Sequence, residues 1–500
     1  MKYCFYYDES EHSRVINLST VTGETYYDSF ITSIVGWHSD NEEVIEKRYL
    51  DFEEKYAFRK KSGELKSDTF KAKQFTYGFA SLNKGNIELL NDFFSIFDDN
   101  CYVYLSIISK IEYVIIQLFK NYHSSFRVDM DAIRYSIVKS ILTYRPQEVI
   151  CSLYKSPREF VNSLIDFLSD RIERNKANLV LKRQENEAFR VILWMLQDVE
   201  PPIALEWDYH ISFIGFDLFL KSKGITDCSL AIDKEGKVGV DSKTLVAARQ
   251  VGLKNCIELD SKAHFGIRMA DMFAGIIGKL MKSLGRSLTP AASNSEPIKM
   301  LLDSRWFELS ENQLLLYKKL YHIVYEINND WYKIYAGNNS DDLISFMGLL
   351  EFMNHFDSVK DIEKDFDMQP EYCNSCICRR LETHFQQMQN KLPIEPVEPE
   401  TKDYFRNQQG AKVYFDINRQ PILGLKEGPN RYMVLSVGFF KDGSPLMTVE
   451  ELPENACYRL PVQLREWAIS LAGLANMGTN LFPSKVVITK INNQIYADIL

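Results

Sequence analysis

The chain has 500 residues, of which 45% are hydrophobic and 25% are charged, and its formal net charge is −9. This composition is that of a globular protein with enough chain for two or three hydrophobic cores. The acidic balance excludes a protein that coats nucleic acid with its whole surface, so a nucleic-acid partner needs a local basic patch. Scattered cysteines, an N-terminus without a secretory pattern and the lack of an apolar run of about 20 residues predict a cytoplasmic protein without membrane segments.

The first part of the chain predicts an α/β domain over residues 1–287. Residues 2–7 are apolar or aromatic at almost every position, which is typical of a central strand that is buried on both faces. Residues 30–37 predict a second strand, antiparallel to the first. Further strands are expected over residues 101–109, 229–233 and 257–260, and a helical insertion over about 111–200.

The second part of the chain changes character. Residues 288–390 have helical periodicity, and residues 391–404 are rich in proline and glutamate, which predicts a stiff extended linker. Residues 405–500 predict a small α+β domain. By analogy we expect this C-terminal region to bind a protein partner or to form a homo-oligomer.

One acidic residue lies on the apolar side of a predicted helix. Residues 265–284 carry apolar side chains at helical spacing, and Asp271 has Ile267, Ala274 and Gly275 as neighbours one turn away. An ionised carboxylate among such residues is costly unless a metal ion or a hydrogen-bond donor compensates it. The alternative is a partly exposed helical aspartate.

Several other carboxylates follow predicted strands. Asp8 stands at the end of the central strand, where it is the natural ligand to bridge two metal ions, and Glu64 and Asp271 are candidates for the outer positions. Mg²⁺ or Mn²⁺ needs only a few carboxylates, because it keeps several waters. We therefore expect Asp8, Glu64 and Asp271 to be catalytic. The full set of expected metal ligands is Asp8, Glu9, Glu64, Asp233, Asp260 and Asp271.

Three motifs resemble one bacterial family. Residues 6–10 (YYDES), 64–66 (ELK) and 266–275 (GIRMADMFAG) are similar to motifs of uncharacterised ribonuclease H-like proteins, often encoded among mobile-element and phage-defence genes. The resemblance covers roughly residues 1–285. It implies a ribonuclease H-like mixed sheet and a nuclease that uses Mg²⁺ or Mn²⁺, possesses metal-binding acids at Asp8, Glu64 and Asp271, and acts in phage defence.

Three positions depart from the family pattern. Glu11 stands where a glycine is common. Arg268 replaces a common glutamine, and Ser109 stands where members often have an aspartate. A site that is one acid short favours the alternative function, a catalytically impaired module that binds nucleic acid or protein.

Lysines accompany the proposed acids. We expect Lys60, Lys61, Lys66 and Lys262 to bind the phosphate backbone without reading sequence. The alternatives are a solvated charged turn, or lysines that pair with the carboxylates near them.

The helical region carries two further patterns. Cys373, Cys376 and Cys378 have the ligand type that suits Zn²⁺, but the second ligand pair of a zinc finger is absent, so we favour reduced thiols. Arg379 and His384 fit the Arg-x4-His spacing of small helical ribonucleases, a pattern that occurs often by chance.

Overall fold

A computed structural model gives the structure of the chain. It describes residues 2–10, 26–119, 122, 130–152, 155–202, 210–234, 241–288, 301–327, 341–390, 404–406, 412–414, 421–439, 444–450, 456–476, 481–491 and 494–500. The chain forms two compact units. Unit 1 comprises residues 1–117, 138–154 and 204–388, and unit 2 comprises residues 118–137, 155–203 and 389–500.

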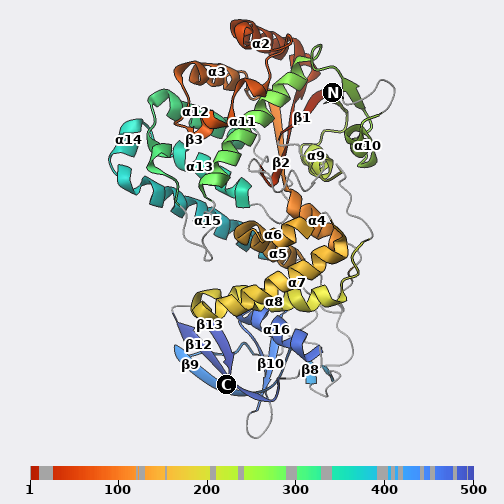
Figure 1. The fold of residues 1–500 in the computed structure, drawn as a ribbon, viewed down its shortest axis with the longest axis vertical. Helices are drawn as coiled ribbons and strands as arrows, with labels where there is room; N and C mark the ends of the chain where they lie inside the picture. Colours follow the sequence, from red (N-terminus) through yellow and green to blue (C-terminus); the bar gives the residue numbers. More distant parts are fainter. Residues whose placement is uncertain are drawn as a thin grey trace. The chain divides into compact units, whose positions relative to one another are not determined.

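Unit 1 is built on a mixed five-stranded sheet with the order β4-β2-β1-β5-β6 (Figure 1). Its strands are β1 (Tyr3–Ser10), β2 (Ser29–His38), β4 (Cys101–Ser109), β5 (Cys228–Asp233) and β6 (Cys256–Leu259). The central strand β1 pairs antiparallel with β2 and parallel with β5. The expected α/β class and the expected antiparallel first pair are therefore confirmed.

The sequence of β1 explains its central position. Phe5 and Tyr7 belong to the core on one face of the sheet, and Tyr6 belongs to the larger core on the other face. Because successive side chains of a strand alternate, a strand that is apolar on both faces must be covered on both. Helix α9 (His210–Ser222) and helix α10 (Lys243–Gln250) contribute to the core with Phe5 and Tyr7.

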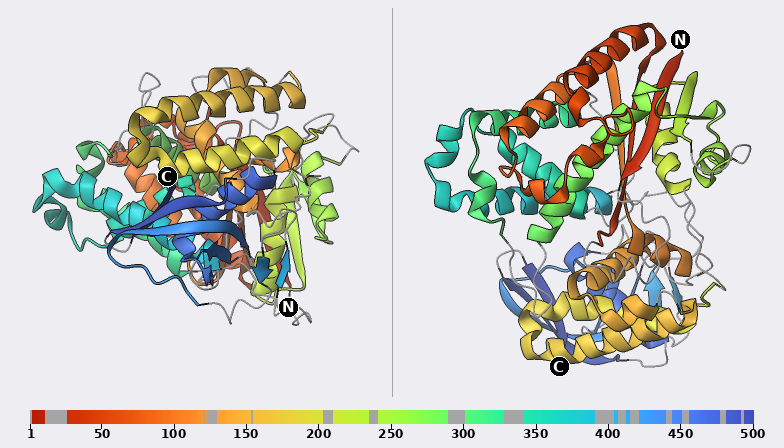
Figure 2. Two further views of the ribbon diagram at one scale, coloured as in Figure 1. Left: turned by 90° about the horizontal axis from the view of Figure 1, so that it is seen from below. Right: turned by 45° about the horizontal axis from the view of Figure 1, so that its top comes forward.

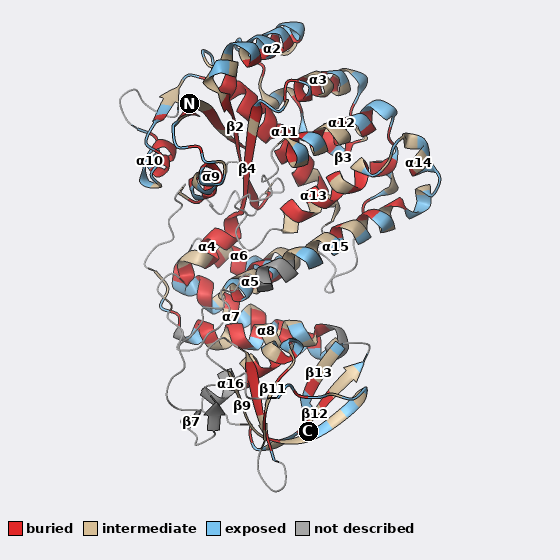
Figure 3. Ribbon diagram, turned by 180° about the vertical axis from the view of Figure 1, so that it is seen from behind, coloured by how far each residue is buried: buried red, intermediate tan, exposed pale blue. Residues whose placement is uncertain are grey.

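Helix α11 (Phe265–Ser287) covers the other face and is buried along most of its length (Figure 3). Two glycines let it lie close to β1. A Cβ on Gly266 would lie 2.3 Å from the ring of Tyr6, and a Cβ on Gly278 would lie 2.8 Å from Oγ of Ser10. The helix therefore runs along the Tyr6–Ser10 segment of β1, with the side chain of Asp8 on the strand face between these two contacts.

The remaining elements of unit 1 share the core of α11 or connect to it. Helices α2, α3, α12, α13 and α15 contribute buried residues to the same apolar cluster. The bounds are α2 (Glu42–Lys55), η2 (Ala57–Arg59), η3 (Ser67–Thr69), η4 (Ala72–Phe75), β3 (Thr76–Phe79), α3 (Lys84–Phe94), α4 (Lys110–Leu118), α6 (Gln147–Ser152), η6 (Ser304–Phe307), α12 (Glu311–Tyr321), η7 (His322–Glu326), α13 (Asp341–Asn354), α14 (Val359–Glu363) and α15 (Gln369–Asn390). Helix α5 (Met130–Tyr144) contributes to both units.

Unit 2 contains an antiparallel sheet with the order β11-β10-β9-β12-β13. Its elements are α7 (Pro157–Asn175), α8 (Leu179–Asp198), β9 (Gly428–Phe439), β10 (Pro445–Val449), β11 (Ala456–Arg459), α16 (Arg465–Asn476), β12 (Ser484–Ile491) and β13 (Gln494–Ile499), with a separate pair β7 (Tyr404–Arg406) and β8 (Lys412–Tyr414). Helices α7 and α8 lie beside this sheet (Figure 2), and Arg183 of α8 pairs with Asp498 of β13 at 3.2 Å.

These units divide the chain differently from the ranges expected from the sequence. The helices of residues 301–388 belong to unit 1, because their apolar faces are buried in the core of α11. Helices α7 and α8 of the expected insertion belong to unit 2, where α8 packs against α16. Most of the expected linker, residues 391–403, lies outside the described residues. Within the described part of the chain, no helix has the length and apolar character needed to cross a membrane.

Candidate active site

Asp8 and Asp271 bring two carboxylates together between β1 and α11. Burial raises the pKa of Asp8 well above its ordinary value, and the nearby charge of Asp271 raises it further. Burial also raises the pKa of Asp271. Both residues are of intermediate exposure, so solvent still reaches them. Two carboxylates that repel each other in a desolvated place are a common feature of sites that bind a cation or hold a proton.

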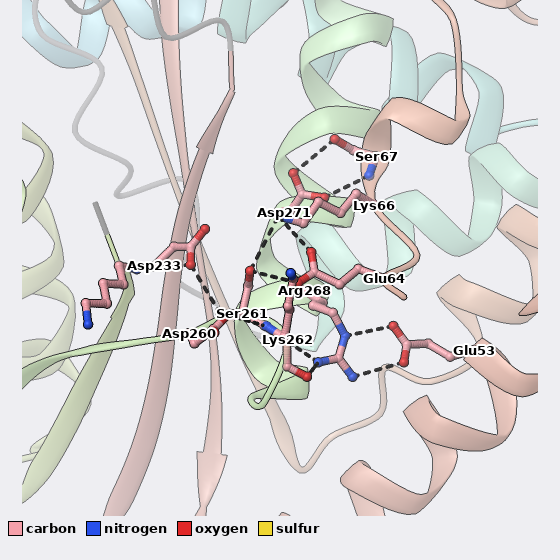
Figure 4. A network of polar contacts seen from close by, with 11 residues as sticks. Glu53, Glu64, Lys66, Ser67, Asp233, Asp260, Ser261, Lys262, Arg268 and Asp271 are labelled. Carbon is pink, nitrogen blue, oxygen red and sulfur yellow. Dashed lines mark hydrogen bonds and ion pairs between the residues drawn. The ribbon is translucent and has the colours of Figure 1, made fainter. Parts of the chain in front are cut away.

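Ser67 fixes the orientation of Asp271 (Figure 4). Its backbone N–H donates to Oδ2 of Asp271 at 2.8 Å, and its hydroxyl donates to Oδ1 at 3.1 Å. Gly275, one turn further along α11, makes this contact possible, because a Cβ there would lie 2.2 Å from Cβ of Ser67. The small residues near Asp271 thus admit the loop that holds its carboxylate.

Glu64 is placed by a tight turn. The backbone groups of Lys61 and Glu64 exchange two hydrogen bonds of 2.9 and 3.0 Å, and the residues between them, Ser62 and Gly63, have φ values of 52° and 91°. Positive φ at both central residues is typical of a type I′ turn, for which glycine is favoured. The Glu64 carboxylate accepts from Lys66 at 2.9 Å and from the hydroxyl of Ser261 at 3.3 Å. A cation therefore already neutralises Glu64.

Asp233 lies at the end of β5, beside the central strand. Its Oδ1 accepts from the backbone N–H of Ser261 at 3.3 Å and from that of Lys234 at 3.0 Å. Burial raises its pKa, although the charge of Lys66 acts in the opposite direction. The charge of Asp233 also contributes to the raised pKa of Asp8, so Asp233 belongs to the same electrostatic cluster.

Two of the expected ligands are placed elsewhere. Glu9 alternates with Asp8 on β1 and lies on the other face of the sheet, where it accepts from the hydroxyl of Tyr7 at 2.6 Å. Asp260 is exposed after β6 and accepts from the backbone N–H of Lys262 at 3.0 Å. The structure thus brings Asp8, Asp233 and Asp271 into one cluster with Glu64 at its border.

Ser33 is a residue of this site that the sequence did not indicate. It pairs directly with Asp8 across the β1–β2 ladder, so both side chains lie on the same face of the sheet. Ser33 is fully buried, and among the described residues its hydroxyl has no hydrogen-bond partner. A water or a bound ligand at the site would supply the missing partner of this hydroxyl.

The donor set fits a divalent cation with few protein ligands. No group of three or more His, Cys, Asp or Glu side chains suited to hold a metal ion occurs within the described ranges. Mg²⁺ and Mn²⁺ sites that act on phosphates need only one or two carboxylates, because waters and substrate oxygens complete the shell. Asp8 and Asp271, with the hydroxyl of Ser33 beside them, meet this smaller requirement.

The expected nucleic-acid lysines differ in their surroundings. Lys60 pairs with Glu53 at 3.6 Å, and Lys61 pairs with Asp68 at 2.6 Å. Lys66 is half-buried at the carboxylate cluster, whereas Lys262 is exposed in the turn before α11. Burial lowers the pKa of Lys66, but Glu64, then Asp233 and Asp271, outweigh this and raise it. Only Lys66 is therefore bound to the cluster itself.

Two of the three departures from the family pattern have structural roles, and the third, Glu11, lies outside the described residues. Arg268 forms a two-pronged ion pair with Glu53 of α2 at 2.8 and 2.9 Å, and it donates to the backbone carbonyl of Ser261 at 2.7 Å. Ser109 donates to the buried carboxylate of Asp28 and accepts from the backbone N–H of Glu112 at 3.0 Å. Arg268 thus connects α11 to α2, and Ser109 caps the start of α4.

The cysteines of α15 do not converge. Cys373 is buried, Cys376 donates to the carbonyl of Gly348 at 3.7 Å, and Cys378 is exposed. All three are free thiols. Positions 373 and 376 share a helix face that 378 does not, because a helix turns once in 3.6 residues.

The Arg-x4-His pattern lies on the same helix. Arg379 pairs with Glu351 at 3.6 Å and approaches the sulfur of Cys376 at 3.8 Å. His384 is half-buried one turn further along. Within the described part of α15, no contact between the side chains of Arg379 and His384 supports a catalytic pair.

Comparisons with known proteins found none that is significantly similar to this chain. No family model matches the chain, and no curated protein and no solved structure is significantly similar to it. The functional argument therefore rests on the geometry of the site.

Proposed function

We propose that the protein is a divalent-metal-dependent phosphodiester hydrolase with a ribonuclease H-like domain. One observation carries the proposal: Asp8 of the central strand and Asp271 of α11 place two mutually repelling carboxylates beside the unpartnered hydroxyl of Ser33. A bound cation removes the repulsion and gives Ser33 a partner through its water shell.

Each residue of the cluster has a role in this proposal. Asp8 and Asp271 hold the cation, and Asp233 adds negative charge from β5. Ser67 keeps the carboxylate of Asp271 in one orientation. Lys66, which lies near Glu64, Asp233 and Asp271, offers a positive charge to a phosphate that displaces it from Glu64. Mg²⁺ or Mn²⁺ supplies Lewis-acid chemistry, in which water is activated and the leaving oxygen is stabilised.

The ribonuclease H-like fold is part of the proposal. The mixed sheet supports it, since a central opening strand pairs antiparallel with the next strand and parallel with the strand that carries Asp233. A role in phage defence and a cytoplasmic location follow only from the family resemblance and the composition.

Cleavage assays test this proposal. Labelled single- and double-stranded DNA and RNA are incubated with Mg²⁺ or Mn²⁺ and with wild type, Asp8→Asn or Asp271→Asn. Both variants should lose activity by about 10²- to 10³-fold, the range seen when a catalytic electrostatic group is removed. Asp260→Asn is the matched control, because Asp260 is an exposed acid outside the cluster. Activity that survives in Asp8→Asn but falls in His384→Ala contradicts the proposal.

A binding module is the second candidate function. It is favoured by the ion pair of Glu64 with Lys66 and by the small number of converging acids among the described residues. This candidate predicts oligonucleotide binding without cleavage by any version. It also predicts that Mn²⁺ titration shows no saturable site that depends on Asp8.

A further inference from the structure

Phe58 is the most exposed of the large hydrophobic residues in the described chain. It lies in η2, directly after α2, and 79% of its surface is accessible to solvent. Single exposed apolar residues are common on protein surfaces, so a role for this ring depends on its surroundings.

The ring is held in a defined setting. The guanidinium of Arg59 lies 5.7 Å from the ring centroid, and its NH1 donates to Oδ1 of Asn86 at 2.6 Å. Asn86 is buried near the start of α3. Backbone hydrogen bonds from Arg59 to Tyr56 at 2.9 Å and from Lys60 to Ala57 at 3.0 Å fix η2 itself. The platform formed by Phe58 and Arg59 is therefore preorganised.

The platform leads to the carboxylate site. Lys61 lies opposite Glu64 across the tight turn, and Phe58 precedes Lys61 by three residues. Three residues span at most about 11 Å of extended chain. A strand of a few nucleotides that touches Phe58 can thus reach the border of the proposed active site.

The charge around the platform suits a polyanion. Residues 58–73 contain six lysines and arginines but only two acids, in a chain whose net charge is −9. Lys71 and Lys73 are exposed, and the ion pair of Lys61 with Asp68 lies at the surface, where phosphate groups compete effectively.

We infer that Phe58 and Arg59 form a stacking platform for an unpaired base, and that the substrate of the proposed hydrolase is single-stranded nucleic acid. The inference rests on the proposed function and names its substrate class. An aromatic face next to basic residues is how proteins bind single strands without reading sequence, because every base has a face to stack. In a duplex those faces are already stacked on one another, and the platform offers no way to open them.

Binding measurements in a cleavage-deficient background test the inference. The full chain with Asp8→Asn is titrated, by fluorescence anisotropy, onto a labelled 12-nucleotide strand of DNA or RNA, the same strand in duplex form, and an abasic strand of equal charge. Phe58→Ala should weaken binding of the intact strand by about 5- to 150-fold, the range for loss of one stacked base. Phe58→Trp should restore it. Leu50→Ala, an exposed apolar residue of α2, is the matched control and should bind as the parent does.

Three outcomes overturn the inference. They are equal binding by Phe58→Ala and its parent, an equal loss on intact, abasic and duplex probes, and no binding by any version. Cleavage assays with the wild type and with Phe58→Ala alone, both of which keep Asp8, distinguish failure of the platform from failure of the proposed function. If the wild type cleaves with metal and Phe58→Ala cleaves equally well, the platform is contradicted but the proposed hydrolase is not. If binding depends on Phe58 but the wild type does not cleave, the platform is supported and the proposed hydrolase activity is contradicted.

Discussion

Two carboxylate environments lie one turn apart along α11. In the first, Glu53 is fully buried and its two oxygens meet the guanidinium of Arg268. In the second, Asp8 and Asp271 are partly accessible and face each other's negative charge. The first pair is neutral within the protein, whereas the second is not. Their difference separates a carboxylate that stabilises the fold from the carboxylates that we propose to bind a cation.

The same helix takes part in both environments, but substitutions in the two should have opposite effects on stability. Removal of one partner from the first pair exposes an uncompensated charge, so the protein should lose stability. Removal of one acid from the second pair relieves repulsion, so the protein should gain stability and lose its site. Four changes test this contrast, in decreasing order of their effect on stability.

Arg268→Met should give the largest effect. It removes the two-pronged partner of the buried Glu53 carboxylate and leaves Lys60, 3.6 Å away, as a remaining cation, so we expect the free energy of unfolding to fall by up to about 3–5 kcal/mol in urea titrations. The double variant Glu53→Leu with Arg268→Met should recover most of the loss, because an apolar pair replaces an ion pair. A loss of less than about 1 kcal/mol in the single variant would show that solvent already screens this pair.

Gly275→Ala should lower both the stability of the protein and its affinity for Mn²⁺. The added Cβ would meet Ser67 at 2.2 Å, so the loop that holds Asp271 must move. We expect a destabilisation of about 1–3 kcal/mol together with weaker Mn²⁺ binding. Gly285→Ala is the matched control on the same helix, because its Cβ makes ordinary contacts, with Tyr27 at 3.4 Å and with Oδ2 of Asp342 at 3.9 Å. Alanine there should be neutral or stabilising by up to about 1 kcal/mol. Equal behaviour of the two variants would exclude a role for close approach.

Asp8→Asn should stabilise the protein, and the gain should depend on pH. The folded-state pKa of Asp8 is raised above its ordinary value of 3.8, so the folded protein retains a proton that the unfolded chain releases. Wild-type stability contributed by this group is therefore complete below pH 3.8 and falls as the pH rises towards the folded-state pKa.

The stability difference between Asp8→Asn and wild type should accordingly be small at low pH and grow above it. Each unit by which the pKa is raised corresponds to about 1.4 kcal/mol. Thermal unfolding at several pH values measures the difference. Addition of Mn²⁺ should reduce it, since the ion stabilises only the wild type. A variant that is less stable than wild type at pH 7 without metal would contradict the idea of repulsion.

Ser33→Ala should have the smallest effect on stability. Its hydroxyl has no protein partner among the described residues, so its loss should change the free energy of unfolding by less than about 0.5 kcal/mol. The affinity for Mn²⁺ should nevertheless fall by about 10- to 100-fold, as for residues that support metal ligands. Thr32→Val is the control on the same strand, where Thr32 already bonds to Ser212 at 3.3 Å. Unchanged Mn²⁺ affinity in Ser33→Ala would remove Ser33 from the site.

Local pattern was sufficient to select Asp8 and Asp271, which the structure brings into one cluster. Asp8 follows an apolar strand and Asp271 interrupts an apolar helix face, and both signals lie within a few neighbouring residues. The antiparallel first pair of strands was predicted from two adjacent apolar segments and is confirmed.

The partners of these acids could not be predicted in the same way. Ser33 joins the site through the register of β1 with β2, which depends on which residues pair across the sheet. Glu53 and Arg268 are separated by 215 residues, and no local pattern connects them. The alternation of β1 likewise sends Glu9 to the opposite face, although adjacency in sequence suggested that it would share the site with Asp8.

The helical pattern of the sequence also could not predict the unit to which α7, α8 and α12 belong. An amphipathic helix shows that one face is buried, but not which core buries it. Helix α12 buries Leu316 and Tyr317 in the core of α11, whereas α8 packs against α16.

The placement of Asp8 and Asp271 also determines when the site can exist. Asp8 belongs to β1, and Asp271 belongs to α11, which is made much later, after β5 and β6. Translation at about 5–20 residues per second separates the two by roughly tens of seconds. During that interval a growing chain carries only half of the carboxylate pair. The proposed hydrolase, assembled in this order, would stay inactive beside the messenger and ribosomal RNA that surround its own synthesis, and would gain activity only when its α/β domain is complete.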